Sequence, residues 1–271
     1  MLGLGRKVMG LALGGGAVRG FAHIGVLKVL AQADIEPSYV AGTSVGSLIG
    51  ALYCAGYSWS QIMETAADIE WKDLVKLSFP KLGVVRPEGL RDLIDRLVEG
   101  RNIEDLNIPY AAVAVDLVTA AEVVFDSGPI STAVLASCSI PGIFVPVQTE
   151  NAVLVDGGVL NAVPADVVKR MGAEYVVAVD LNANAQGSDE RPDSILDVAA
   201  RSMALFRTAT SSKGLSYADC IVQPDLKGFS YHSMSRRDEM VKRGEAAMNG
   251  SLSKVQRRVK SHKIQQRRER F

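Results

Sequence analysis

The chain has 271 residues, of which 48% are hydrophobic and 22% are charged, so its composition is that of a globular protein with a core. This composition excludes a disordered chain, a collagen-like chain and a coiled-coil rod. Lys and Arg together number 30, as do Asp and Glu, so the chain as a whole does not have the charge of a nucleic-acid-binding protein.

Strand-like and helix-like segments alternate along the chain. Short apolar runs predict strands, and apolar residues at helical spacing predict helices. The expected strands are 7–13, 39–42, 111–117, 122–125, 152–155, 175–181 and 220–222, and the expected helices are 18–33, 45–55, 59–69, 88–98, 130–136, 165–171, 193–213 and 234–248. Residues 74–87 are expected to form an irregular surface loop or lid, and residues 182–192 a polar loop. This alternation predicts an α/β three-layer sandwich, with a mostly parallel central sheet and helices on both faces.

Cysteine usage and hydropathy indicate where the chain works. The three cysteines have neither a disulfide framework nor a zinc-binding spacing, which indicates free thiols in a reducing compartment. No apolar run reaches the length of a membrane-spanning helix. Arg6 and Lys7 before an apolar run imitate a signal peptide, but the glycines at 14–16 would interrupt its apolar region. We therefore expect a cytoplasmic protein, and the sequence indicates no metal site and no cofactor.

The first of three glycine-bearing turns runs from Gly14 to Gly20, between the first expected strand and helix. Glycines let the backbone approach a ligand, and free N–H groups at a helix start favour an anion. A nucleotide phosphate, a lipid phosphate and a catalytic oxyanion all fit, and a tight structural turn is the alternative. No Walker A residues follow Gly20, and Arg19 stands where a dinucleotide fingerprint needs its third glycine.

The second turn, Gly42-Thr43-Ser44-Val45-Gly46, matches the G-x-S-x-G nucleophile elbow. A short apolar strand precedes it and a helix of small apolar residues follows, as the elbow requires. This context favours Ser44 as a nucleophile over a turn that only packs small residues.

The third turn, Asp156-Gly157-Gly158, follows an apolar strand and places a carboxylate at the same edge of the predicted sheet. A turn-capping aspartate is the alternative. A serine nucleophile needs a base. His232 would complete the chain order Ser…Asp…His of α/β-hydrolases, although their elbow comes later in the chain. His23 is equally well explained as a packed or capping histidine, and His262 lies in the basic C-terminal segment.

Five segments of the chain share their residues and their order with one known family. They are 14–20, 42–46, 136–146, 155–158 with Asn161 and Pro164, and 218–224 with Gly244. In these segments, from about residue 7 to about residue 250, the chain resembles the patatin-like phospholipases. It is most similar to the small bacterial type related to the catalytic domain of neuropathy target esterase.

The resemblance implies the patatin or FabD-lysophospholipase-like fold and a Ser–Asp dyad that uses no histidine. Ser44 would attack an ester carbonyl, and Asp156 would take the serine proton. The residues implied around this dyad are Gly14, Gly15, Gly16 and Ala17 as the oxyanion hole, and Arg19, Gly42, Gly46, Gly157 and Gly158 in supporting roles. For Arg19, holding the loop in place is favoured over meeting a lipid phosphate. Ser137, Cys138 and Ser139 are expected to pack around the site rather than to react.

The predicted function is that of a serine acyl-ester hydrolase, a lysophospholipase or phospholipase A-like esterase that works through an acyl-enzyme. The alternatives are acyl transfer by the same dyad and a non-catalytic regulatory protein that keeps the fold. We expect one domain over residues 1–250 and a basic tail over 251–271, because residues 254–270 hold eight Lys or Arg and one acid, Glu269. The tail would be a solvated helix or would dock peripherally on an anionic membrane leaflet. Specific nucleic-acid binding is disfavoured, because no aromatic residues interleave the basic ones.

Overall fold

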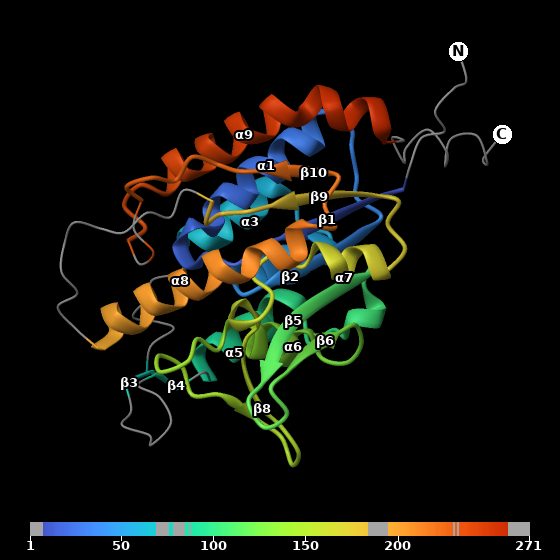
Figure 1. Cartoon of the computed structure of the whole chain (residues 1–271). Helices are drawn as coiled ribbons and strands as arrows, with labels where there is room; N and C mark the ends of the chain where they lie inside the picture. The colour runs from blue at the N-terminus through green and yellow to red at the C-terminus, as the bar shows by residue number, and fades with distance from the viewer. Residues whose placement is uncertain are drawn as a thin grey trace.

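A central mixed sheet organises the structure, which is a computed structural model (Figure 1). The described residues are 8–68, 76–77, 85–86, 88–183, 195–229, 231 and 233–259. Within them the strands of this sheet are β1 (Met9–Leu13), β2 (Tyr39–Thr43), β5 (Tyr110–Asp116), β6 (Ala121–Phe125), β7 (Val147–Gln148), β8 (Val153–Asp156), β9 (Tyr175–Val179) and β10 (Cys220–Val222). Their order is β10-β9-β1-β2-β5-β8-β7, with β6 paired to β5.

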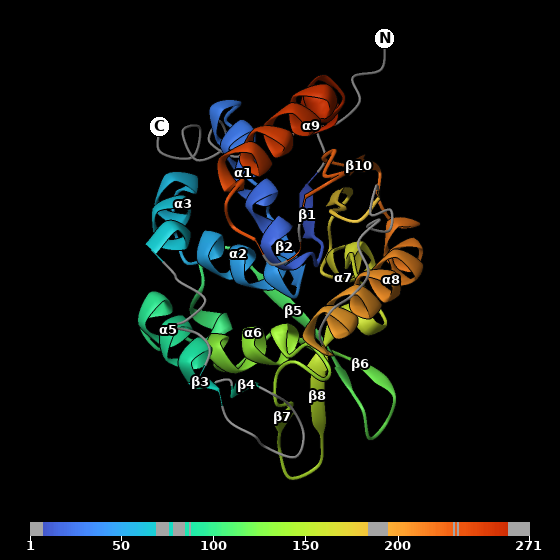
Figure 2. The same cartoon turned by 90° about the vertical axis from the view of Figure 1, so that its left-hand side faces the viewer.

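The sheet is parallel over part of its width and antiparallel over the rest. Strands β10, β9, β1, β2 and β5 are parallel, whereas β6 and β8 run antiparallel to β5, and β7 runs antiparallel to β8. Figure 2 shows β6, β7 and β8 together at one end of the sheet, away from β10. The antiparallel β8 ends next to the carboxyl end of β2, because Asp156 pairs with Ala114 and Thr43 pairs with Val113 of the same strand β5.

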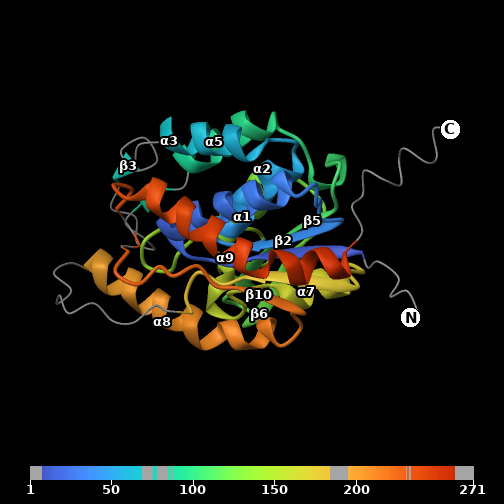
Figure 3. The ribbon, with the colours of Figure 1, turned by 90° about the horizontal axis from the view of Figure 1, so that it is seen from above.

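Helices cover both faces of the sheet, which confirms the predicted sandwich. Figure 3 shows α7 and α8 on one side, and α1, α2, α3 and α5 on the other. Their bounds are α1 (Phe21–Gln32), α2 (Val45–Cys54), α3 (Trp59–Asp68), α5 (Glu88–Val98), α6 (Ile130–Cys138), α7 (Ala165–Arg170), α8 (Ile195–Leu215) and α9 (Arg237–Arg258). Three short 3-10 helices are η1 (Ala17–Gly20), η2 (Ile103–Asp105) and η3 (Gly157–Val159).

Each central strand is buried on both faces, as parallel strands between helix layers must be. In β1, Leu11 and Leu13 pack into the larger core with α1, α2 and α9, whereas Ala12 faces a smaller cluster beside α7. This is the period-two alternation of strand side chains. Since every residue of β1 and β9 is buried, their sequences form the apolar runs that predicted them.

The sequence-based elements are confirmed with small shifts at their ends, and two expectations are wrong. Residues 74–87 were expected to be irregular, but β3 (Lys76–Leu77) and β4 (Val85–Arg86) pair antiparallel. Strands of two residues are too short to show an alternating pattern. The other residues from 74 to 87 lie outside the described part of the chain, as do 184–192 of the expected polar loop.

The last helix is longer than its predicted 234–248. It ends at Arg258 and so runs across the expected domain boundary at residue 250. Met248 and Val255 are seven residues apart, on one helix face, and both are fully buried. The many charged side chains around them hid this spacing in the sequence. Residues 260–271 of the expected tail lie outside the described residues.

Helices α1 and α9 pack closely because a glycine on each admits the other's backbone. A Cβ at Gly244 of α9 would overlap the carbonyl of Ala22, and a Cβ at Gly25 of α1 would overlap the carbonyl of Val241. Gly250, six residues further along α9, has no atom within 4 Å of a built Cβ.

We expect Gly244→Ala to lower the free energy of unfolding by about 3 kcal/mol, because the added methyl must push the two backbones apart. The matched control Gly250→Ala is expected to raise it by about 0.5–1 kcal/mol, since alanine there meets open space and favours the helix. Urea unfolding of the three proteins measures both changes. Equal stabilities of the two variants would contradict the close α1–α9 contact.

Candidate active site

Ser44 lies on the sharp turn between β2 and α2. Its backbone angles, φ 55° and ψ −130°, are strained for a residue with a side chain. A Cβ at Gly42 would overlap the carbonyl of Gly46, and a Cβ at Gly46 would overlap that of Leu13. The elbow therefore needs glycine at both positions, and it presents Ser44 at the carboxyl end of the sheet.

Hydrogen bonds from neighbouring elements hold the elbow. The Ser44 N–H donates to Ser137 Oγ (2.8 Å), and Ser137 Oγ donates to the carbonyl of Val113 (2.6 Å). Ser47 Oγ donates to the carbonyl of Ser44 (2.6 Å). Ser137, which we expected to pack around the site, thus links the nucleophile turn to β5.

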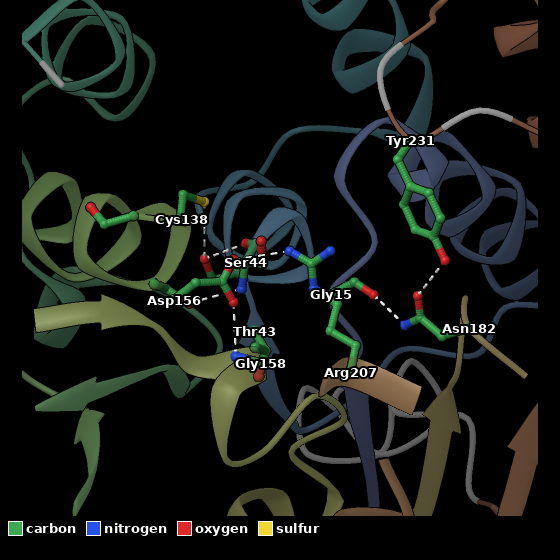
Figure 4. Close-up of polar contacts among 12 residues, drawn as sticks. Gly15, Thr43, Ser44, Cys138, Asp156, Gly158, Asn182, Arg207 and Tyr231 are labelled. Atoms are coloured by element: carbon green, nitrogen blue, oxygen red, sulfur yellow. Dashed lines mark hydrogen bonds and ion pairs between the residues drawn. The ribbon is translucent and has the colours of Figure 1, made fainter. Parts of the chain in front are cut away.

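Asp156 ends β8 beside the elbow and is fully buried (Figure 4). Its N–H donates to the carbonyl of Ser139 (2.9 Å), and its Oδ1 accepts from the N–H of Gly158 (2.8 Å). Its Oδ2 pairs with Arg207 Nη2 of α8 at 3.2 Å. The structure has no hydrogen bond between the Ser44 hydroxyl and the Asp156 carboxylate, two groups within its described residues. A close approach of Gly157 to the carbonyl of Val113 keeps this turn against β5.

The glycine loop offers fewer free amides than the sequence suggested. The N–H of Gly14 donates to the carbonyl of Val179 (3.0 Å), and that of Gly15 donates to the carbonyl of Ala162 (2.9 Å). The N–H groups of Gly16 and Ala17, at the start of η1, have no acceptor among the described residues. Of the four residues that the resemblance names, these two remain free to bind an oxyanion.

Two side chains tie the loop to the rest of the fold. Arg19 is buried, and it donates from Nε and Nη2 to the carbonyl of Phe229 and from Nη1 to Tyr231 Oη (2.8 Å). Its guanidinium also lies 3.8 Å from the centre of the Tyr231 ring. Asn182 Nδ2 donates to the carbonyl of Gly15 (2.7 Å). Arg19 is therefore engaged within the chain, which supports the loop-holding role.

His23 also supports the loop. It is fully buried, and its Nε2 donates to the carbonyl of Gly14 (2.7 Å), which fixes the proton on Nε2. Burial lowers the pKa of His23 to about 4, so the ring is neutral at pH 7. His232 and His262 lie outside the described residues.

Because the folded-state pKa of His23 lies below the reference value of about 6.5, the unfolded chain binds more protons between pH 6.5 and 4. The free energy of unfolding is therefore expected to decrease as the pH is lowered through this window. His23 alone should account for a loss of about 2 kcal/mol at pH 5 relative to pH 7. In His23→Gln, whose amide can still donate to Gly14, this share of the loss is expected to vanish. Urea unfolding of both proteins at pH 7 and pH 5 measures it, and equal losses would refute the assignment to His23.

An apolar cavity of about 160 Å³ opens at Ser44. Its walls are side chains of α1 and α2, of the segment after α6 and of Met234; they include Phe21, Ile24, Leu48, Ile140 and Phe144. Cys138 also lines it. Burial, together with the nearby Asp156, raises the pKa of the Cys138 thiol to about 12, so it stays protonated and is a poor nucleophile.

Arg207 is the site residue that sequence reasoning missed. It stands in α8, far along the chain from both Ser44 and Asp156, and its side chain is 1% exposed. The only local signal is an arginine within a run of small and apolar residues.

Among the described residues we find no group of three His, Cys, Asp or Glu placed to hold a metal ion. Likewise, no helix in the part of the chain that the structure describes is long and apolar enough to span a membrane.

A serine on a strained strand-to-helix turn, beside a buried carboxylate, places the chain among α/β proteins with a nucleophile elbow. Within that class the chain belongs to the patatin-like phospholipase family, whose model matches residues 11–169. The match includes the glycine loop, Ser44 and Asp156. Members of this family are generally hydrolases of lipid acyl esters.

Curated relatives agree with this membership. An NTE family protein of Mycobacterium tuberculosis is 34% identical over 180 residues, which are 65% of this chain and 50% of the relative. Patatin-like phospholipase domain-containing protein 7 of Rattus norvegicus is 35% identical over 187 residues, 65% of this chain and 14% of that protein. The chain thus matches half or less of the length of these relatives.

Two solved structures share the fold at low sequence identity. VipD from Legionella pneumophila superposes with a TM-score of 0.67 at 12% identity, over 92% of this chain and 67% of that chain. The type III effector protein ExoU superposes with a TM-score of 0.52 at 14% identity, over 94% of this chain and 54% of that chain.

Proposed function

We propose that this chain is a serine acyl-ester hydrolase of lipids, a lysophospholipase or phospholipase A-like esterase, with Ser44 as nucleophile and Asp156 as base. The observation that carries the proposal is the strained elbow, which presents Ser44 between an apolar cavity and a buried carboxylate. The apolar cavity suits an acyl chain, and members of the family generally hydrolyse lipid acyl esters.

In the proposed reaction, Ser44 Oγ attacks the ester carbonyl while its proton passes to the Asp156 carboxylate. A rotation of the Ser44 side chain about χ1 would bring its hydroxyl toward Asp156, whose oxygens keep unused lone pairs. The negative charge of the tetrahedral intermediate would be bound by the N–H groups of Gly16 and Ala17. The protonated Asp156 then gives its proton to the leaving alcohol, and an acyl-enzyme remains on Ser44.

The second half of the proposed reaction returns the enzyme to its first state. Asp156 takes a proton from water as the water attacks the acyl carbonyl, and the Ser44 oxygen leaves and recovers that proton. An aspartate is a weak base in water, so the reaction depends on a fixed geometry and on the exclusion of water. The burial of Asp156 provides both.

Covalent labelling tests this function without knowledge of the natural substrate. A fluorophosphonate probe is expected to modify the native chain on the peptide that contains Ser44, and to leave heat-denatured protein unmodified. The native chain should also hydrolyse p-nitrophenyl esters and release fatty acid from a lysophospholipid. Absence of both labelling and turnover would favour the non-catalytic alternative. Ester product that grows when glycerol is added would favour acyl transfer.

The turnover assay also tests whether the chain contacts a membrane surface. We propose that the enzyme acts in the cytoplasm and that the basic residues from Lys254 onward attract anionic lipid, at about 1 kcal/mol per basic residue near the surface. Turnover of lysophospholipid held in anionic vesicles should then exceed that in neutral vesicles at low salt. Equal turnover in both would contradict this contact.

A further inference from the structure

A buried cation faces the proposed base. Arg207 is 1% exposed and Asp156 is not exposed at all, yet the two are joined by a 3.2 Å ion pair between Nη2 and Oδ2 (Figure 4). The guanidinium lies over the glycine loop, since a Cβ built on Gly15 would be 3.2 Å both from Arg207 Nε and from Ser44 Cβ. Arg207 therefore lies close to the nucleophile Ser44, to the base Asp156 and to the glycine loop.

The surroundings argue against a purely structural arginine. Burying an ion pair removes two charges from water, and an apolar residue of similar volume is often at least as stabilising. Nε of Arg207 is also buried without any hydrogen-bond partner among the described residues, which carries a desolvation cost. Packing alone does not account for a cation held in this way beside a carboxylate.

We propose that Arg207 is a positioning residue, which orients Asp156 for its role as the base. The inference rests on the proposed function. The Gly158 N–H holds Oδ1 and Arg207 holds Oδ2, and these two contacts fix the plane of the carboxylate. A carboxylate oxygen accepts about two hydrogen bonds, so both oxygens can still receive the Ser44 proton. This is the role that an orienting partner has for the base of other activated nucleophiles.

The cation also sets the charge around the base. Among the described residues, the titratable groups that face Asp156 are Arg207 from α8 and Cys138 from α6, and the thiol of Cys138 is uncharged at neutral pH. Arg207 in turn lies near Arg19 and Tyr231, which bond to each other. Within the described part of the chain, Arg207 is therefore the counter-ion of Asp156.

The experiment compares Arg207→Met, Arg207→Lys and the control Ser211→Ala, each as the full chain. Ser211 is buried one turn further along α8 and donates to the carbonyl of Arg207 (2.6 Å), so its loss disturbs the helix without removing charge. For each protein we would measure thermal stability, fluorophosphonate labelling rate, and kcat and KM for a p-nitrophenyl ester.

With Arg207→Met, kcat is expected to fall by about 10²-fold with KM changed less than threefold, since the loss lies in orienting the base. Arg207→Lys keeps a cation and should recover part of the lost kcat. Ser211→Ala should retain kcat even if it is less stable.

Two results would overturn the positioning role. One is a folded Arg207→Met with the wild-type kcat, and the other is a variant faster than wild type, which would show that Arg207 restrains Asp156. If Arg207→Met does not fold, a wild-type kcat in Arg207→Lys, whose point charge cannot copy the guanidinium, would count against the proposal. Wild-type protein that neither labels nor turns over would instead refute the proposed function itself.

Discussion

Replacing Ser44 by alanine is expected to lower ester turnover by at least about 10⁴-fold and to abolish fluorophosphonate labelling, because the other hydroxyl of the elbow, that of Thr43, is fully buried and donates to the carbonyl of Asn161. The backbone should be unaffected, since the N–H and carbonyl of residue 44 keep their bonds to Ser137 and Ser47. Both the initial rate with p-nitrophenyl butyrate and the probe signal on a denaturing gel measure the effect. Residual labelling at the wild-type rate would exclude Ser44 as the nucleophile.

A matched substitution separates the chemistry of Ser44 from its strain. Ser44→Gly should be as inactive as Ser44→Ala, but it should be more stable than wild type by about 1–2 kcal/mol, because glycine accepts the positive φ of 55° without a side-chain clash. Ser44→Ala keeps a Cβ and should gain little. Urea unfolding ranks the three proteins. A Ser44→Gly variant that is no more stable than Ser44→Ala would mean that the turn stores no strain.

The elbow could be predicted from the sequence because its signal is local. Gly42, Ser44 and Gly46 stand within five residues, between a strand and a helix that their own apolar patterns predict. The same holds for the fold class, since the strands buried on both faces are continuous apolar runs. The pairing of Ser44 with Asp156 depended on a family resemblance, because it is the sheet order that places β8 beside β2 across β5.

What the sequence could not supply is the pattern of hydrogen bonds between distant segments. Gly14 and Gly15 look as suitable for an oxyanion hole as Gly16, and only the positions of Val179 and Ala162 show that their amides are already engaged. The same limit hid Arg207. Its role comes from the way α8 crosses the carboxyl end of the sheet, and no spacing in the sequence encodes that crossing.

Replacing Asp156 by asparagine is expected to lower turnover by at least about 10³-fold, because the amide cannot accept the serine proton. Asparagine has nearly the same shape, and its oxygen can still accept from the Gly158 N–H. The loss should therefore be in kcat, measured with the same ester. The variant should also be less stable by about 3–5 kcal/mol, since Arg207 would keep a buried charge without its counter-ion.

A control variant and a variant of the alternative base, His232, complete the test of Asp156 as the base. Asp116 is a buried aspartate at the end of β5. Among the described residues it accepts only from its own turn and from Val153, so Asp116→Asn should retain turnover. His232→Ala should likewise retain most of it if the base is Asp156 alone. Loss of turnover in His232→Ala, with Asp156→Asn retaining a substantial rate, would replace the dyad with a histidine base. Loss in both would indicate a Ser–His–Asp triad, in which the carboxylate orients the histidine instead of taking the proton itself.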